Sequence, residues 1–172
     1  MNSNSEVNFR KAIDNDYDAI WTIIEQSIER RRKDGSTQWQ NGYPNRDSIQ
    51  EDLEKEYGYV ITVDKVVAVY GALIKNDEPA YEKIIGEWLS SGDYIVVHRV
   101  AILENFAGQG LAKIFFDYIE EFAKSQSIYS IKVDTNFDNS AMLKILDGRG
   151  YQYCGEVHVS GGFRKAFEKI LV

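Results

Sequence analysis

The sequence has 172 residues, of which 44% are apolar and 27% are charged, and its formal net charge at pH 7 is −7. This length and balance are typical of a water-soluble globular protein with one sizeable core. The acidic balance argues against a nucleic-acid partner, which needs a basic face, and favours cationic partners such as amines. The sequence has no run of 18 apolar residues, so we expect neither a transmembrane helix nor a membrane partner.

The N-terminus and the few reactive side chains indicate the cellular compartment in which the protein is expected. The first residues, MNSNSEVNFRKA, lack the apolar stretch of a secretory signal, and Cys154 is a lone cysteine that cannot form an intramolecular disulfide. We therefore predict a cytoplasmic protein in which Cys154 is a small buried apolar residue. With only two histidines, we expect no metal. Residues 1–6 are predicted to be a disordered tail, and residues 7–172 to form a single domain.

The first third of the chain predicts two helices and a loop. Apolar residues recur at helical spacing from Asp16 to Arg31, with Asp14 or Asp16 as the cap. The polar stretch KDGSTQWQNGYPNRDS is predicted to be a loop. Asp47 is then predicted to cap a short helix, with Gln50 at capping-box spacing.

The middle of the chain predicts mainly strands. The stretch YGYVITVDKVVAVYGALI indicates two strands joined at Asp64 and Lys65. A short helix is predicted from Tyr81 to Leu89. The run YIVVHRVAIL is almost continuously apolar, which is typical of a central strand covered on both faces.

The last third predicts two helices alternating with strands. The helix after Gly110 has an apolar stripe, and the strand IYSIKVDTN follows it. A second helix, in DNSAMLKILDGRG, begins at Asp138 or Asn139, and two strands joined around SGG form a hairpin. The whole order predicts an α/β fold with a mixed sheet and a glycine turn near its middle.

The turn between the central strand and its helix contains Gly108 and Gly110. A helix N-terminus offers free N–H groups to an anion, and glycine lets the backbone approach closely and adopt a positive φ, so the turn is suited to phosphate. A P-loop does not fit, because Lys113 is misplaced and Ile114 follows it instead of a hydroxyl residue. A Rossmann turn fits poorly, because the third small position is missing.

The segment AGQGLA, from Ala107 to Ala112, resembles the Q/R-x-x-G-x-G/A signature of the GCN5-related N-acetyltransferases, the GNAT family. Gly110 and Ala112 match the last two positions, whereas Ala107 stands where Gln or Arg is usual. The upstream residues VAILENF also resemble the family's strand, with Phe106 in its aromatic position.

A second segment carries the same resemblance. The stretch NSAMLKILDGRGY is similar to the family's N-x-x-A-x-x-L-Y-x-x-x-G-F run, and Asn139, Gly150 and Tyr151 match it. The family's element order also matches the order predicted above. The resemblance implies a GNAT-like acyl-CoA N-acyltransferase fold, with a central splayed mixed β-sheet flanked by helices.

The resemblance further implies acetyl-CoA as the co-substrate. In the family the turn's amides hold the pyrophosphate, a bulged strand pairs with the pantetheine arm, and the second segment lies near CoA. The implied contacts in this chain are Val100, Ala101, Ile102, Ala107, Gly108, Gln109, Gly110, Leu111, Ala112 and Asn139.

Acetyl transfer to an amine requires loss of the amine proton, stabilisation of an oxyanion and departure of a thiolate. The family often uses Glu or His on the central strand as the base. Val96 fills one such position, but His98 has the same side-chain parity unless a bulge intervenes, so it is the candidate base or else a satisfied core histidine. Arg99 is expected to be structural or salt-bridged. The family's usual acid, a Tyr, corresponds to Leu146 here, so the thiolate leaves unprotonated or takes its proton from water.

The acceptor is expected to be a small-molecule or peptide amine. Trp39 and Tyr43, in the polar loop, either line the acceptor site or anchor the loop on the core. The sequence leaves open whether the protein is a homodimer. It also leaves an alternative function, a CoA- or acyl-CoA-binding module with little catalysis, for which Ala107 and Leu146 argue.

Overall fold

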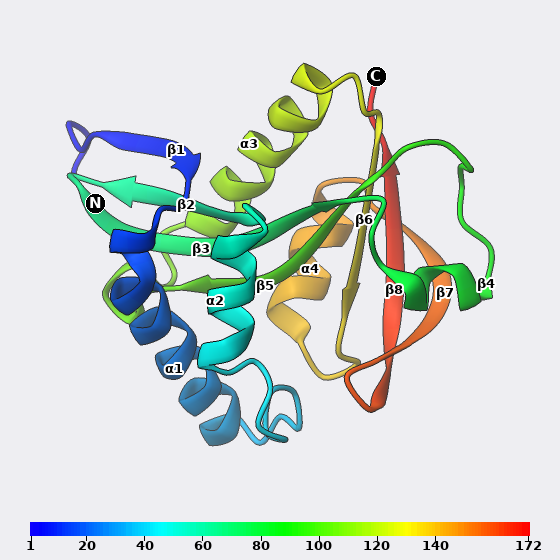
Figure 1. The fold of residues 1–172 in the computed structure, drawn as a ribbon, viewed down its shortest axis with the longest axis horizontal. Coiled ribbons are helices and arrows are strands. Elements are labelled where there is room, and N and C mark those ends of the chain that lie inside the picture. The colour runs from blue at the N-terminus through cyan, green and yellow to red at the C-terminus, as the bar shows by residue number, and fades with distance from the viewer. The chain divides into compact units, whose positions relative to one another are not determined.

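A computed structural model describes residues 1–172 and contains a mixed sheet of eight strands in the order β1-β2-β3-β5-β6-β8-β7-β4 (Figure 1). Strands β5 and β6 are parallel, whereas the neighbours β1, β2 and β3, and likewise β6, β8, β7 and β4, are antiparallel. The mixed sheet confirms the predicted fold class.

The chain divides into two compact units, so the expectation of one domain over residues 7–172 stays a prediction. The first unit comprises Met1–Leu73 with Arg99–Tyr118, and the second comprises Ile74–His98 with Ile119–Val172. Three elements pass from one unit to the other along the chain: β3 (Val66–Lys75), β5 (Ile95–Ile102) and α3 (Leu111–Ser125).

The remaining elements of the first unit are β1 (Val7–Lys11), the 3₁₀ turn η1 (Asp14–Asp16), α1 (Tyr17–Lys33), α2 (Arg46–Glu54), β2 (Gly58–Val63) and the 3₁₀ turn η3 (Glu104–Phe106). Those of the second unit are the 3₁₀ turn η2 (Pro79–Lys83), β4 (Ile85–Gly86), β6 (Ser130–Thr135), α4 (Ser140–Gly148), β7 (Gln152–Val159) and β8 (Gly162–Ile170). None of the helices is both long and apolar enough to cross a membrane.

Both predicted hairpins have the backbone that a two-residue turn requires. Asp64 and Lys65, between β2 and β3, have φ of 48° and 70°. Ser160 and Gly161, between β7 and β8, have φ of 51° and 77°. Two successive positive φ values match the twist of antiparallel strands, which is why such turns join hairpins tightly.

The caps of the first two helices differ from the prediction. The helix α2 begins after Asn45, whose side chain accepts a hydrogen bond from the Ser48 backbone N–H at 3.0 Å, so Asp47 is not the cap. The side chain of Asp16 does not cap α1, because its carboxylate binds Arg10 at 2.7 and 2.9 Å and the Ile13 N–H at 2.9 Å.

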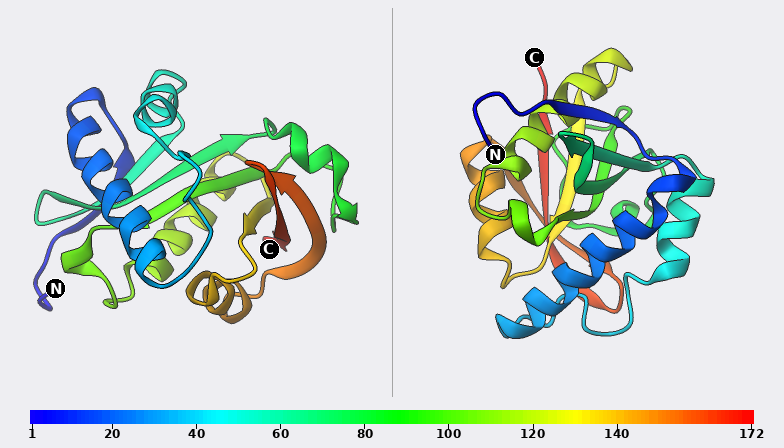
Figure 2. Two further views of the ribbon diagram at one scale, coloured as in Figure 1. Left: turned by 90° about the horizontal axis from the view of Figure 1, so that it is seen from below. Right: turned by 90° about the vertical axis from the view of Figure 1, so that its left-hand side faces the viewer.

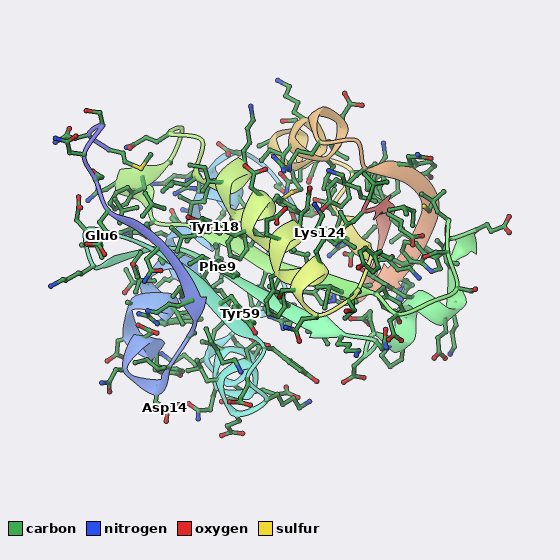
Figure 3. The ribbon with its side chains drawn as sticks, turned by 90° about the horizontal axis from the view of Figure 1, so that it is seen from above. Glu6, Phe9, Asp14, Tyr59, Tyr118 and Lys124 are labelled. Carbon is green, nitrogen blue, oxygen red and sulfur yellow. The ribbon has the colours of Figure 1, made fainter.

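The strand β1 was not predicted, because its position is decided by distant partners. Phe9 pairs in register with Ile61 of β2. Its ring stacks on Tyr59 at 5.5 Å and on Tyr118 of α3 at 5.2 Å. Figure 3 labels these three residues. Aromatic stacking stabilises the fold beyond what the buried area of the rings contributes. This five-residue strand is therefore held by contacts that the local sequence does not reveal.

The predicted helix from Tyr81 to Leu89 is wrong. The segment instead forms η2 and the short strand β4. The Leu89 N–H donates to the buried carboxylate of Glu168 at 2.6 Å, and the Trp88 indole N–H donates to the Tyr81 carbonyl at 2.8 Å. These tertiary hydrogen bonds take the place of helical ones, so the apolar spacing of the segment does not produce a helix.

Side chains alternate along β3, so neighbouring residues point to opposite faces of the strand. Tyr70 lies in a buried cluster with residues of α1 and α2, which cover one face of β2 and β3 (Figure 2). Gly71 faces the other way, toward Phe115 of α3: a Cβ added at Gly71 would lie 2.5 Å from Phe115 Cε1. Glycine is therefore required here for space. The contact sets how closely the first turns of α3 approach the strand.

We expect Gly71→Ala to lower the free energy of unfolding by about 2 kcal/mol, because the fully buried Phe115 ring must move to admit the methyl group. The matched control is Gly148→Ala at the end of α4, where an added Cβ meets nothing within 4 Å. Urea denaturation of both variants measures the difference, and equal stabilities would contradict the packing argument.

The ion pair of Arg10 and Asp16 makes stability depend on pH. The hydrogen bond from Arg10 lowers the pKa of the Asp16 carboxyl, so the pair stabilises the folded chain above the carboxyl's usual pKa of about 4. This contribution is lost as the pH falls through the lowered pKa. We expect Asp16→Asn to cost about 1 kcal/mol at pH 7 and almost nothing near pH 2. Chemical denaturation at both pH values measures it, with the exposed Asp14→Asn as control.

Candidate functional site

The turn before α3 has the backbone of a glycine loop. Gly108 and Gly110 have φ of 74° and 79°, and a Cβ added at either would meet nothing within 4 Å. Glycine is therefore required at both positions by conformation and not by lack of space, since other residues rarely adopt this left-handed backbone. Ala107, Gly108, Gln109 and Gly110 are all exposed.

The first residues of α3 anchor this exposed turn. Leu111 is fully buried and Ala112 is 8% exposed, so the start of the helix is held by the core. The Gln109 amide donates to the Asn105 carbonyl at 3.0 Å, which closes the turn on η3. The first N–H groups of an α-helix have no partner within the helix and carry its positive dipole end. The arrangement suits a bound anion.

The strand β5 contains a break between its two halves. Its parallel pairing with β6 covers Ile95, Val96 and Val97. Arg99 follows with φ of 56°, and it is the one residue other than glycine with a positive φ inside a strand. A residue in this conformation bends a strand and ends its regular pairing. This interruption at Arg99 is the feature that the predicted splayed strand requires.

The backbone of Arg99 is held by a buried ion pair. Its guanidinium donates to both oxygens of Asp52, at 2.8 and 2.5 Å, and the two side chains are 10% and 3% exposed. The Tyr70 hydroxyl donates to the same carboxylate, and Arg99 also donates to the Tyr43 hydroxyl. A left-handed backbone costs about 1–2 kcal/mol, which a fully bonded buried pair offsets.

The charges of this cluster are stable near neutral pH. Burial raises the pKa of Tyr70 far above its usual value, and the charge of Asp52 raises it further, so the phenol remains a donor. Burial lowers the pKa of Arg99, but Asp52, Tyr43 and Tyr70 together raise it above its usual value, so the guanidinium remains charged. The expectation that Arg99 is salt-bridged is confirmed.

His98 lies in a second polar cluster, within the second unit. Its Nε2 is 2.7 Å from Glu78 Oε2, and its Nδ1 is 3.7 Å from Asp134 Oδ2. The side chains of His98, Glu78 and Asp134 are 11%, 18% and 8% exposed. The imidazole therefore has a carboxylate beside each nitrogen, an arrangement that can accept and hold a proton.

Tyr81 contacts both His98 and Asp134 of this cluster. Its hydroxyl donates to Asp134 at 2.6 Å, and its ring contacts His98 edge-on at 6.1 Å. Burial raises the pKa of Tyr81 well above its usual value, and Asp134 raises it further, so the hydroxyl donates and does not ionise. Asp134 is thereby fixed beside His98.

Sequence reasoning did not identify Glu78, Asp134 or Asp52. Glu78 precedes Pro79, and its carboxylate accepts from the Ala80 N–H at 3.4 Å, so local sequence marks it only as the cap of η2. Asp134 and Asp52 are ordinary members of a strand and a helix. No spacing relates any of them to β5, because the pairing arises from the tertiary fold.

The two loop aromatics have different surroundings. Trp39 packs against the buried cluster of α1 and α2, and the Arg31 guanidinium lies 3.8 Å from its ring centre. Tyr43 contacts Arg99 of β5 through its hydroxyl. The first arrangement anchors the loop on α1, and the second connects it to the strand.

The remaining predicted residues lie in the second unit. Asn139 caps α4 by accepting from the Met142 N–H at 3.2 Å, and Leu146 is fully buried. Tyr151 is 5% exposed, and burial raises its pKa far above the usual value, so its hydroxyl remains protonated. Cys154 is buried, as expected, and burial raises the pKa of its thiol. The side chains form no group of three or more His, Cys, Asp or Glu suited to a metal ion.

Comparison with known proteins gives a consistent result. The sequence model of the Acetyltransferase (GNAT) family matches residues 15–151. Over 148 residues the chain is 25% identical to the uncharacterized N-acetyltransferase YesJ of Bacillus subtilis (strain 168), a match that covers 84% of this chain and 81% of YesJ.

Solved structures agree with the sequence match. A GNAT-family acetyltransferase from Streptococcus agalactiae 2603 superposes with a TM-score of 0.89 at 38% identity, and the match covers 96% of both chains. A GNAT-family acetyltransferase from Listeria monocytogenes 4b F2365 superposes with a TM-score of 0.79 at 20% identity, covering 99% of this chain and 98% of that one. The second likeness concerns the fold alone.

Proposed function

Since the chain belongs to the GNAT family of acetyltransferases and is an enzyme of that class, we propose that it moves an acetyl group from acetyl-CoA to a primary amine. The observation that carries the proposal is the turn from Ala107 to Ala112. Its two left-handed glycines lead into the N-terminus of α3, and only Leu103 and η3 separate the turn from the end of β5.

The turn fits a pyrophosphate. Its glycines are exposed, and the space that a Cβ would occupy at Gly108 and Gly110 is open, so an anion can approach the backbone closely. Ala107 offers no side-chain donor, so the amides of the turn and of the first helical residues hold the phosphates. Val100, Ala101 and Ile102 follow the left-handed Arg99 and would pair with the pantetheine arm.

Acetyl-CoA supplies the acetyl group as an activated thioester when bound. The amine must lose its proton before it can attack, and we assign this step to the pair of His98 and Glu78. The Glu78 side chain, 18% exposed, is more exposed than those of His98 and Asp134, and its Oε2 lies 2.7 Å from His98 Nε2. A proton taken up there is stabilised by Asp134 on the other side of the imidazole.

No tyrosine stands at the family's usual acid position, since Leu146 is fully buried and apolar. Tyr151 remains protonated, but its hydroxyl is buried. The thiolate therefore leaves without an acid from α4 and takes its proton from water, which the modest pKa of a thiol, about 8.5, permits.

Binding is tested by thermal shift and calorimetry with CoA and acetyl-CoA. Both ligands are expected to raise the melting temperature. Gly110→Ala is expected to weaken CoA binding about tenfold, because the left-handed turn then has to be restored on binding. Gly92→Ala, at an exposed glycine of ordinary φ with open space around it, is the control. No melting shift at millimolar CoA would refute the co-substrate.

Catalysis is tested by thiol release from acetyl-CoA with spermidine, kanamycin, lysine and a peptide with N-terminal alanine. His98→Ala and Glu78→Gln are each expected to lower kcat about 10²-fold near neutral pH, with partial recovery at high pH, where the amine deprotonates in solution. His158→Ala, at the other histidine, which is exposed, is the control.

Two outcomes of the thiol assay would change the proposal. An unchanged pH–rate profile in both His98→Ala and Glu78→Gln would remove this pair from the mechanism. CoA binding without thiol release for any of the four amines would favour a CoA-binding module instead.

A further inference from the structure

We propose that Arg99 is a positioning residue for acetyl transfer. Through Asp52 it fixes the half of β5 expected to pair with pantetheine, and through Tyr43 it fixes the loop of residues 34–45, which we expect to line the acceptor site. This inference rests on the proposed function, and it assigns acceptor recognition to the loop between α1 and α2.

The contact with Asp52 determines the direction of the strand. Nε and Nη2 of Arg99 bind this carboxylate, which Tyr70 also binds, and the ion pair is almost completely buried. Leaving a buried charge without its partner costs a large free energy, so the Arg99 guanidinium is held in one orientation. The left-handed backbone of Arg99 is therefore held in place immediately before Val100, the first of the three strand residues expected to pair with pantetheine.

The contact with Tyr43 determines the position of the loop. Elsewhere the loop is attached to α1, through the Trp39 ring against Arg31 and through the Gln40 amide, which donates to the Ile28 carbonyl at 3.0 Å. The bond from Arg99 to the Tyr43 hydroxyl instead connects the loop to β5. One guanidinium thus joins the loop to the strand.

Arginine suits this role because its planar guanidinium donates hydrogen bonds to two acceptors, Asp52 and Tyr43, at a fixed angle. Lysine carries a single ammonium on a flexible stem and cannot reproduce that geometry. Arg99→Lys keeps the charge beside Asp52 but does not maintain the bond to Tyr43. Tyr43→Phe removes only the hydroxyl acceptor and leaves the contact between Arg99 and Asp52 intact.

The test compares these two variants with Arg10→Lys. Arg10 also forms a two-pronged ion pair with an aspartate, Asp16, but it lies outside β5, so it controls for loss of an ion pair as such. The readouts are amide hydrogen exchange of residues 34–45, the Kd for CoA by calorimetry, and steady-state KM values for acetyl-CoA and the fastest of the four amines above.

Tyr43→Phe is expected to speed exchange of the loop about fivefold and to raise KM for the amine by a similar factor, with the Kd for CoA unchanged. Arg99→Lys is expected to speed loop exchange and also to weaken CoA binding about tenfold. Arg10→Lys is expected to lower the unfolding midpoint in urea while loop exchange, Kd and KM stay at the wild-type values.

Two results would overturn the inference. Loop exchange at the wild-type rate in both Tyr43→Phe and Arg99→Lys would show that Arg99 does not hold the loop. Equal changes in all three variants would show that Arg99 acts only through stability. A wild-type protein that does not bind CoA would instead refute the proposed function, and loop exchange would still report separately on the link from Arg99 to Tyr43.

Discussion

The left-handed backbone at Arg99 is the constraint on which the functional features of this protein depend. It interrupts β5 after the residues that pair with β6, and the boundary between the two compact units falls at the same place. His98 immediately precedes it, and the strand that leads to the glycine turn follows it. The conformation is unfavourable in isolation, and the buried contacts with Asp52 and Tyr43 stabilise it.

In the second unit, too, buried polar groups hold the backbone in place. The segment from η2 to β5 is attached to the sheet by hydrogen bonds to buried carboxylates as much as by apolar packing. Glu168 is fully buried and accepts from the Leu89 N–H and from the hydroxyls of Ser90 and Ser130, while Asp134 accepts from Tyr81. Each carboxylate is satisfied, which is what makes its burial tolerable. The position of Glu78 beside His98 is a consequence of this attachment.

Glycine has two opposite roles in the first unit, and the sequence does not distinguish them. At Gly108 and Gly110 the surroundings are open, and the residue is required by the sign of φ. At Gly71 the φ is ordinary, and the residue is required because the ring of Phe115 occupies the place of a side chain. Both roles affect the same helix. Gly108 and Gly110 form the turn that precedes α3, and Gly71 allows α3 to approach β3.

Local and periodic features of the sequence determined much of this protein. Apolar spacing predicted α1 and α3, and the residues at its two ends predicted α4. Alternation and turn residues predicted the two hairpins, and the glycine signature with its neighbouring segments indicated the family. These features act through the backbone of a few adjacent residues, so they can be recognised without the fold.

Only the tertiary structure decided the rest. The strand β1 exists because Phe9 stacks between two distant tyrosines, and the segment from Tyr81 to Leu89 is not a helix because its polar groups bind Asp134 and Glu168. The partners in the two polar clusters, Glu78 beside His98 in the second unit and Asp52 beside Arg99 in the first, lie 20 and 47 residues away along the chain. Such pairs depend on which elements the fold brings together, and no local spacing in the sequence specifies them.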